Sequence, residues 1–426
     1  MHTSRSFTSS LVFVLLGVGC SVEAAPPPVV VTPPPVVPEV AKRVELGIDV
    51  LLAPGSEYAA LLVGKRVGLI TNPSGVDGAL VATADRLAHD TRFQLQKLFG
   101  PEHGIRGDAA AGDSVGDALD PVTGIPVESL YGARKSPSPE ALAELDVIVF
   151  DIQDIGSRTY TYVSTLGEAL KGCAAAGKPL VVLDRPNPIG GVVSEGAVIE
   201  ERFKSFIGWG PIPVTHGMTT GEIARYWNAA LAIGCELHVV PLRNWKRSMA
   251  WEDTGLTWTQ TSPHIPHALQ AHLYVATGMV ASSLKNVSDG VGSTLPFEII
   301  AAEFIDGPRF ARELSAFALP GVRFQALAVK PFYGGYKDKP LRGVRLVLED
   351  PRVFKPLRAS LAILITLHKL YGDELLMQSE AVIAKHWGNT QLLEQLRAGA
   401  TIDEIERSWA ATRVEYENLR ASVLLY

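Results

Sequence analysis

The stretch LQKLFGPEHGIRGD, residues 95–108, has the pattern of a buried strand that opens into a polar loop. Its apolar run ends at Gly100 and Pro101, and four ionisable side chains follow within seven positions: Glu102, His103, Arg106 and Asp108. In open α/β sheets, ligands bind beyond the carboxyl ends of the strands. Ionisable groups crowded at such an edge are costly unless they are paired or used in chemistry. We therefore expect a catalytic centre in this loop, with Glu102 as its proton donor.

Three further apolar runs have the same form, at residues 66–71, 147–150 and 180–183. Each ends in a loop rich in Gly, Pro and polar residues, and segments with helical spacing follow at 79–88, 165–176 and 219–231. Alternation of strands and helices predicts an α/β fold with a doubly wound, mostly parallel sheet. If the strands are parallel, all four loops meet at one edge of the sheet and form one site.

The first residues have the composition of a targeting segment. Arg5 precedes an apolar core at 11–18, which is too short to span a bilayer, and Cys20 follows it as at a lipoprotein-type cleavage site. We expect residues 1–20 to be a signal peptide and Cys20 to be lipidated; the alternative is an ordinary secreted protein. Residues 21–43 are a Pro-rich linker. The predicted location is periplasmic or envelope-anchored, after secretion across the inner membrane.

The rest of the chain is long for one hydrophobic core and suggests two domains. We predict a catalytic domain at 44–245, a connecting and covering segment at 246–295 that carries aromatic residues, and a smaller auxiliary domain at 296–426, either α/β or α+β. Within the last, 381–396 has the spacing of one helix. The net charge of −6 gives no basic surface, so nucleic acid is not an expected partner, and membrane contact is expected only through the anchor.

Several familiar motifs fail in their context. GDSVG at 112–116 has the spacing of a hydrolase nucleophile elbow but lacks the strand before it and the helix after it. No nucleotide-binding glycine motif follows the first strand. The histidines at 264, 267 and 272 match no compact zinc spacing. Asp151 and Asp154 could hold Mg²⁺ or Ca²⁺, but sugar-hydroxyl binding and pairing with Arg158 account for them without a metal. We expect neither a metal nor a cofactor.

Carboxylate chemistry remains. Glycoside hydrolysis needs a protonated acid at the leaving oxygen and usually a second carboxylate. Glu102 is best placed for the partial burial that favours a protonated acid. The second carboxylate stays open among the acidic residues of plausible loops: Asp151, Asp154, Asp184, Glu195 and Asp289. The structural alternative for Glu102 is a salt bridge to Arg106 or a helix-capping role.

Long strings of the chain resemble the NamZ-type exo-β-N-acetylmuramidases, long known as a domain of unknown function. They lie at 65–77, 98–108, 123–132, 145–166, 178–191, 212–224 and 417–426. The resemblance implies a Rossmann-like N-terminal domain, a smaller C-terminal domain, and release of N-acetylmuramic acid from non-reducing ends of peptidoglycan fragments. It implies that Glu102 of GPEHG is catalytic. The other residues in matching strings, which we expect around the substrate, are His103, Arg106, Asp151, Asp154, Arg158, Tyr160, Tyr162, Asp184, Arg185, Asn187 and His216.

One loop departs from the family pattern. In SSLKNVSDGVGST, residues 282–294, Asp289 stands where the family tends to have Glu, and Val291 where it tends to have Arg. If this loop binds the lactyl carboxylate of muramic acid, another cation must replace that Arg: Arg158, Arg185 or Lys285. We still expect Asp289 to contact substrate.

The leading hypothesis is an exo-acting glycoside hydrolase of cell-wall turnover, with Glu102 as general acid and peptidoglycan-derived saccharides as substrates. Two rivals remain open. One is a metal-assisted hydrolase that uses Asp151 and Asp154, and the other is a non-catalytic, amino-sugar-binding lipoprotein.

Overall fold

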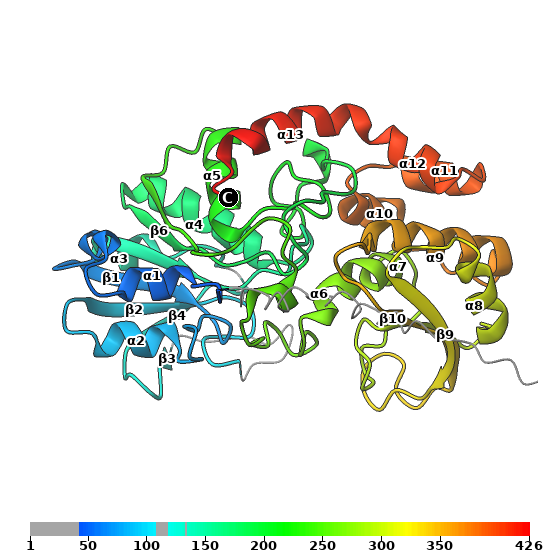
Figure 1. Cartoon of the computed structure of the whole chain (residues 1–426), viewed down its shortest axis with the longest axis horizontal. Helices are drawn as coiled ribbons and strands as arrows, with labels where there is room; N and C mark the ends of the chain where they lie inside the picture. The colour runs from blue at the N-terminus through cyan, green and yellow to red at the C-terminus, as the bar shows by residue number, and fades with distance from the viewer. Residues whose placement is uncertain (1–41, 108–117, 133) are drawn as a thin grey trace, which may run out of the picture. The chain divides into compact units, whose positions relative to one another are not determined.

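Among the described residues, seven strands form a sheet in the first half of the chain (Figure 1). The computed structural model describes residues 42–107, 118–132 and 134–426. The strand order is β3-β4-β2-β1-β5-β6-β7, and every neighbouring pair is parallel except β3 with β4. The strands are β1 (Arg66–Thr71), β2 (Gln94–Gly100), β3 (Ala118–Leu119), β4 (Pro126–Ser129), β5 (Val147–Asp151), β6 (Leu180–Leu183) and β7 (Leu237–Val240). Numbered in chain order, the parallel strands lie 3-2-1-4-5-6, which is the doubly wound Rossmann arrangement.

The central strands are apolar throughout because both faces of the sheet are covered. In β5, Val147 and Val149 pack into the core shared with α1 (Gly47–Leu52) and α2 (Thr83–His89). Ile148 and Phe150 alternate with them and pack on the other face, with α3 (Pro139–Ala143), α4 (Tyr162–Ala176) and α5 (Thr220–Ala230). Side chains alternate across a strand, so covering both faces requires a continuous apolar run. The predicted α/β fold is confirmed.

The four predicted loops meet at one edge of the sheet. Their strands are direct neighbours in the order β2-β1-β5-β6, and all run parallel. Strand order reverses between β1 and β5, where such sheets bind ligands. At this point the Thr71 hydroxyl donates a hydrogen bond of 2.8 Å to the carbonyl of Asp151. The loop after β2, which carries Glu102, lies beside this switch point.

The second half of the chain has its own antiparallel sheet, with the order β8-β10-β9. Its strands are β8 (Ile299–Ala302), β9 (Val322–Val329) and β10 (Leu341–Leu348). The α+β alternative is therefore the one observed. The helices of this half are α6 (Leu269–Leu273), α7 (Met279–Ala281), α8 (Gly307–Ser315), α9 (Pro356–Tyr371), α10 (Glu380–Trp387), α11 (Gln391–Arg397), α12 (Ile402–Ser408) and α13 (Ala410–Val423).

Two expectations for this half have different outcomes. The single helix predicted at 381–396 is wrong: α10 ends at Gly388, whose φ of +95° is a left-handed conformation that favours glycine, and α11 starts after it. Residues 42–426 pack as one compact unit, and the boundaries after residues 245 and 295 stay predictions.

The signal peptide, Cys20, Asp108, the GDSVG motif and all but the end of the linker lie outside the described residues. Within the described part of the chain, no helix is both long enough and apolar enough to span a membrane.

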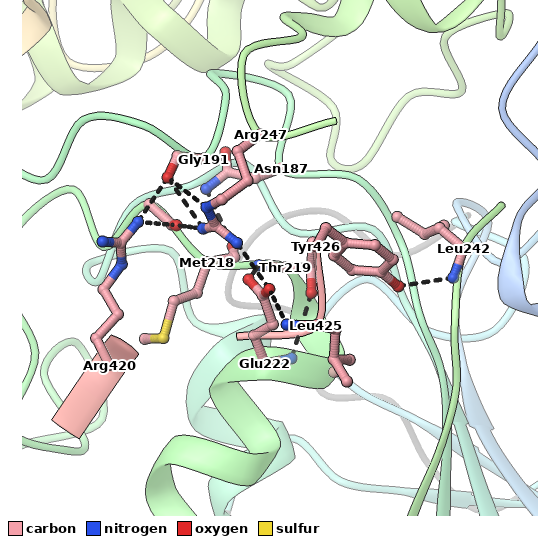
Figure 2. Close-up of polar contacts among 12 residues, drawn as sticks. Asn187, Gly191, Met218, Thr219, Glu222, Leu242, Arg247, Arg420, Leu425 and Tyr426 are labelled. Carbon is pink, nitrogen blue, oxygen red and sulfur yellow. Dashed lines mark hydrogen bonds and ion pairs between the residues drawn. The ribbon is translucent and has the colours of Figure 1, made fainter. Parts of the chain in front are cut away.

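The C-terminus is bound to the first sheet (Figure 2). Helix α13 packs against α5, and the chain then ends with Tyr426 beside the ends of β6 and β7. The Tyr426 hydroxyl donates to Asp184 Oδ2 at 2.7 Å and accepts from the Leu242 amide at 2.7 Å. The Leu425 amide donates to Glu222 Oε1 at 2.8 Å. The last residues of the chain thus donate hydrogen bonds to two buried carboxylates, Asp184 directly after β6 and Glu222 in α5.

We expect Tyr426→Phe to lower the free energy of unfolding by about 1–3 kcal/mol, because it removes a donor from buried Asp184 and an acceptor from the Leu242 amide. Chemical denaturation followed by circular dichroism measures this. Tyr58→Phe is the control, since Tyr58 is a half-buried tyrosine whose hydroxyl makes no hydrogen bond within the described residues. Equal stability of the two variants would show that the C-terminal contacts contribute nothing.

Candidate active site

Glu102 stands in a tight turn after β2. Pro101 is buried, and His103 and Gly104 both have a left-handed φ, of +71° and +73°. A left-handed conformation is uncommon for a residue other than glycine and marks a constrained turn. The turn leaves the Glu102 side chain half-buried at the sheet edge, while His103 is buried.

Two hydroxyl groups flank the Glu102 carboxylate. The Thr161 hydroxyl, at the start of α4, donates to Glu102 Oε2 at 3.3 Å. Tyr131 follows β4, and burial raises the pKa of its hydroxyl; the charge of Glu102 and a hydrogen bond to it add to this increase. Tyr131 therefore stays a neutral donor near physiological pH. The loop after β2, the end of β4 and the start of α4 thus meet at Glu102.

The hydroxyl of Tyr274 is buried and feels the charge of several carboxylates. Burial raises the pKa of Tyr274 to about 12, and the charges of Asp289, Glu102 and Asp154 add to the increase, while a hydrogen bond with Thr159 opposes it. Tyr274 also begins a π-helical turn, Tyr274–Gly278, and such turns are frequent at functional sites.

Asp154 is held in place with one oxygen unused. Its Oδ2 accepts the Gly156 amide at 2.7 Å and lies 3.1 Å from His216 Nε2. The Met218 amide donates to His216 Nδ1 at 3.3 Å, so Nε2 carries the proton and donates to Asp154. Asp154 Oδ1 is buried and has no hydrogen-bond partner among the described residues. A fixed, buried carboxylate oxygen without a partner is suited to accept a hydrogen bond or a proton from a ligand.

Tyrosine rings line the site next to these carboxylates. Tyr160 meets Tyr162 and Tyr274 edge to face, with ring centroids 5.0 and 5.7 Å apart. The Tyr160 hydroxyl donates to Thr261 Oγ1 at 2.9 Å, and the Tyr162 hydroxyl to the Thr261 carbonyl at 2.7 Å. The predicted covering segment therefore holds both rings.

Asp151 and Arg185 form a buried ion pair. Arg185 Nε lies 2.5 Å from Asp151 Oδ1, and Nη2 lies 2.9 Å from Oδ2. The Thr83 hydroxyl donates to Oδ2 as well, at 2.5 Å, and Arg185 also binds the Val76 carbonyl. Both oxygens of Asp151 are occupied by partners inside the protein. Among the described residues, no group of three His, Cys, Asp or Glu side chains has the arrangement of a metal site.

The expected pairing of Arg158 with Asp151 or Asp154 is wrong. Arg158 is fully buried and donates to three backbone carbonyls instead, those of Ala197 and Ile212 at 3.1 Å each and that of His386 in α10. Burial lowers the pKa of Arg158 to about 9. The Arg158 guanidinium thus connects the loops at Ala197 and Ile212 with helix α10, because carbonyl groups of all three segments accept its hydrogen bonds.

Arg106, expected around the substrate, pairs with two aspartates. Its Nε and Nη2 each lie 2.7 Å from Asp120, and Nη2 lies 2.7 Å from Asp85. These hydrogen bonds hold the pKa of the Asp120 carboxyl well below its usual range. A salt bridge between Arg106 and Glu102, the structural alternative for Glu102, is not what the structure shows.

The remaining predicted residues support loops. Asp184 accepts from the Thr219 hydroxyl at 2.8 Å and the Gly221 amide at 2.7 Å, at the start of α5. Asn187 donates to the Met218 carbonyl at 3.1 Å. Glu195 Oε2 accepts the Leu357 amide at 3.2 Å, in the first turn of α9. Of the five candidate second carboxylates, Asp151 and Asp184 accept hydrogen bonds on both oxygens, whereas Glu195, Asp154 and Asp289 each do so on one oxygen among the described residues.

Reasoning from the sequence did not single out Tyr131, Thr159 and Thr161, which contact this site. Tyr131 is the last residue before the glycine of the string VESLYG at 127–132, which is a further short strand candidate. Treating that string as a strand would have placed Tyr131 at the same sheet edge.

The chain is similar along most of its length to one family. Residues 67–269 match the family model described as exo-β-N-acetylmuramidase NamZ, N-terminal, and residues 272–426 match the corresponding C-terminal model. The peptidoglycan β-N-acetylmuramidase NamZ of Bacillus subtilis (strain 168) is 40% identical over 384 residues, which cover 90% of this chain and 92% of that protein.

Two crystal structures of DUF1343 family proteins from Bacteroides fragilis NCTC 9343 are similar to it. One is 37% identical, with a TM-score of 0.83, and the match covers 91% of this chain and 100% of that one. The other is 24% identical, with a TM-score of 0.71 over 90% of this chain and 99% of that one, and supports the fold alone.

Proposed function

The chain belongs to the exo-β-N-acetylmuramidase NamZ family of glycoside hydrolases, and on this premise we propose that it releases N-acetylmuramic acid from non-reducing ends of peptidoglycan fragments. The observation that carries this proposal is a pair of carboxylates at the sheet edge: Glu102, half-buried and bound by the Thr161 hydroxyl, and Asp154, which has a buried oxygen without a partner among the described residues. Glycoside hydrolysis uses a pair of carboxyl groups on either side of the scissile bond. Peptidoglycan-derived saccharides are the substrates, and nothing in the charge of the chain favours nucleic acid.

Glu102 is the general acid in this proposal. It is half-buried, two hydroxyl groups contact or approach it, and the nearest arginine in sequence is bonded to Asp85 and Asp120. In this setting Glu102 can hand a proton to the leaving oxygen while the hydroxyl of Thr161 orients its other oxygen.

Asp154 is the second carboxylate in this proposal. Its free, buried Oδ1 can act on water or on the sugar, while His216 and the Gly156 amide fix Oδ2. Asp289 likewise accepts a backbone amide on one oxygen, that of Val291 at 3.2 Å, but it has no buried oxygen without a partner among the described residues. We assign Asp289 to substrate binding.

Replacing the acid tests the first assignment. Glu102→Gln should lower the turnover of a disaccharide with terminal N-acetylmuramic acid by about 10²–10⁴-fold. A 4-nitrophenyl glycoside should lose less, since its leaving group needs little protonation. Released sugar is measured by mass spectrometry. Glu168→Gln, at a half-buried glutamate of α4 that binds Trp209 Nε1, is the matched control. Full activity of Glu102→Gln would overturn the assignment.

Asp154→Asn should lower turnover at least about a hundredfold, within the range expected for a lost catalytic carboxylate. Azide, a small nucleophile, should restore part of the rate and yield a glycosyl azide. Asp289→Asn, as the matched comparison, should weaken substrate binding without azide rescue. The reverse pattern, with rescue only in Asp289→Asn, would exchange the two roles.

We also propose that the enzyme acts outside the cytoplasmic membrane, anchored through Cys20. The support is the sequence of residues 1–20 alone. In the native host, the full chain should partition into detergent and Cys20→Ser into the aqueous phase. Aqueous partition of both would contradict lipidation, and retention of both in the cytoplasm would contradict export.

A further inference from the structure

The loop between β9 and β10 exposes aromatic rings to solvent. It reads KPFYGGYKDKP at 330–340, with Phe332 58% exposed and Tyr333 40% exposed. Their ring centroids lie 5.3 Å apart. A single exposed apolar side chain is ordinary, whereas adjacent aromatic rings held in place form a surface that suits a ligand.

Backbone contacts fix this loop to the segment that carries Asp289. The Phe332 amide donates to the Gly292 carbonyl at 2.8 Å, and the Tyr336 hydroxyl donates to the Lys285 carbonyl at 3.2 Å. Gly292 has a φ of +98°, and a Cβ there would come within 2.3 Å of the Tyr333 carbonyl oxygen. The two rings are thus presented by a backbone that close packing holds in place.

The same loop reaches the neighbourhood of Glu102. His264 Nε2 lies 2.7 Å from the Tyr333 hydroxyl, and the two rings stack at 6.0 Å with an angle of 18°. Burial lowers the pKa of His264, and the nearby His103 lowers it further. His264 follows Thr261 by three residues, and Thr261 binds the hydroxyls of Tyr160 and Tyr162, which flank the Thr161 that contacts Glu102. On the other side, burial raises the pKa of Tyr336 and the charge of Asp289 adds to it.

We propose that Phe332 and Tyr333 form the binding site for the first sugar ring of the leaving group, the pyranose whose bond to muramic acid is cleaved. This inference rests on the proposed function. An exo-acting enzyme holds the terminal sugar inside its site, so the rest of the glycan extends towards solvent. The C–H face of a pyranose is apolar and packs on an aromatic face, as other amphipathic groups do. Phe332 supplies that face, and His264 holds Tyr333 beside it.

Contact between Phe332 and the first sugar of the leaving group should raise kcat/KM only for substrates that contain this sugar. Phe332→Ala should therefore lower kcat/KM about tenfold for the disaccharide of N-acetylmuramic acid and N-acetylglucosamine. It should change kcat/KM less than about twofold for methyl β-N-acetylmuramide, whose aglycone is too small to reach the ring. Phe332→Trp, which keeps an aromatic face, should retain most activity on the disaccharide. Released N-acetylmuramic acid is measured for both substrates.

Phe317→Ala is the matched control, because Phe317 is 38% exposed and precedes β9, whose eight residues place its two ends roughly 25 Å apart. It should leave both substrates unaffected. Equal loss on both substrates in Phe332→Ala, or loss on neither, with an active wild type, would overturn this inference alone. A wild type that cleaves neither substrate would overturn the proposed function and this inference with it.

Discussion

The buried ion pair between Asp151 and Arg185 organises the edge of the sheet on which the site depends. Only 1% and 2% of these two side chains are exposed. Arg185 follows β6, Asp151 ends β5, and the hydroxyl of Thr83 and the carbonyl of Val76 complete the group. Removing one partner of a buried pair leaves an uncompensated charge and costs about 3–5 kcal/mol. The pair therefore fixes the ends of β5 and β6, on one side of the switch point. Asp154 lies three residues after Asp151.

The far end of the chain supports the same edge. The Tyr416 hydroxyl of α13 donates to the His216 carbonyl, and Arg420 Nη2 binds the carbonyls of Gly191 and Gly217 at 2.5 and 2.8 Å. Figure 2 shows Arg420 and Arg247 on either side of the Gly191 carbonyl. His216 in turn donates to Asp154. The position of one carboxylate thus depends on contacts made about two hundred residues later, which explains how the C-terminal half contributes to a site at the N-terminal sheet.

The local pattern was enough to predict the strands and the edge, but not the partners of the charges. The run VIVF at 147–150 can be buried only between two helical layers, so its location follows from hydrophobicity. Glu102 could be placed at this edge because its apolar strand and its turn are contiguous in sequence. Arg158 was assigned to the wrong partner because its acceptor in α10 lies 228 residues away. The directions of the side chains in the folded state determine which groups pair with a charged residue. The spacing of residues in the sequence does not contain this information.

These internal pairs have a chemical consequence. The positive charges at this edge are directed into the structure, Arg185 to Asp151, Arg106 to Asp85 and Asp120, and Arg158 to backbone carbonyls. A cation beside a general acid favours its ionised form and opposes proton donation. Two hydroxyl groups that interact with Glu102, those of Thr161 and Tyr131, can orient a carboxyl group without adding charge. The carboxylates differ in a related way: both oxygens of Asp151 and of Asp184 accept hydrogen bonds inside the protein, whereas Asp154 keeps one buried oxygen without a partner among the described residues.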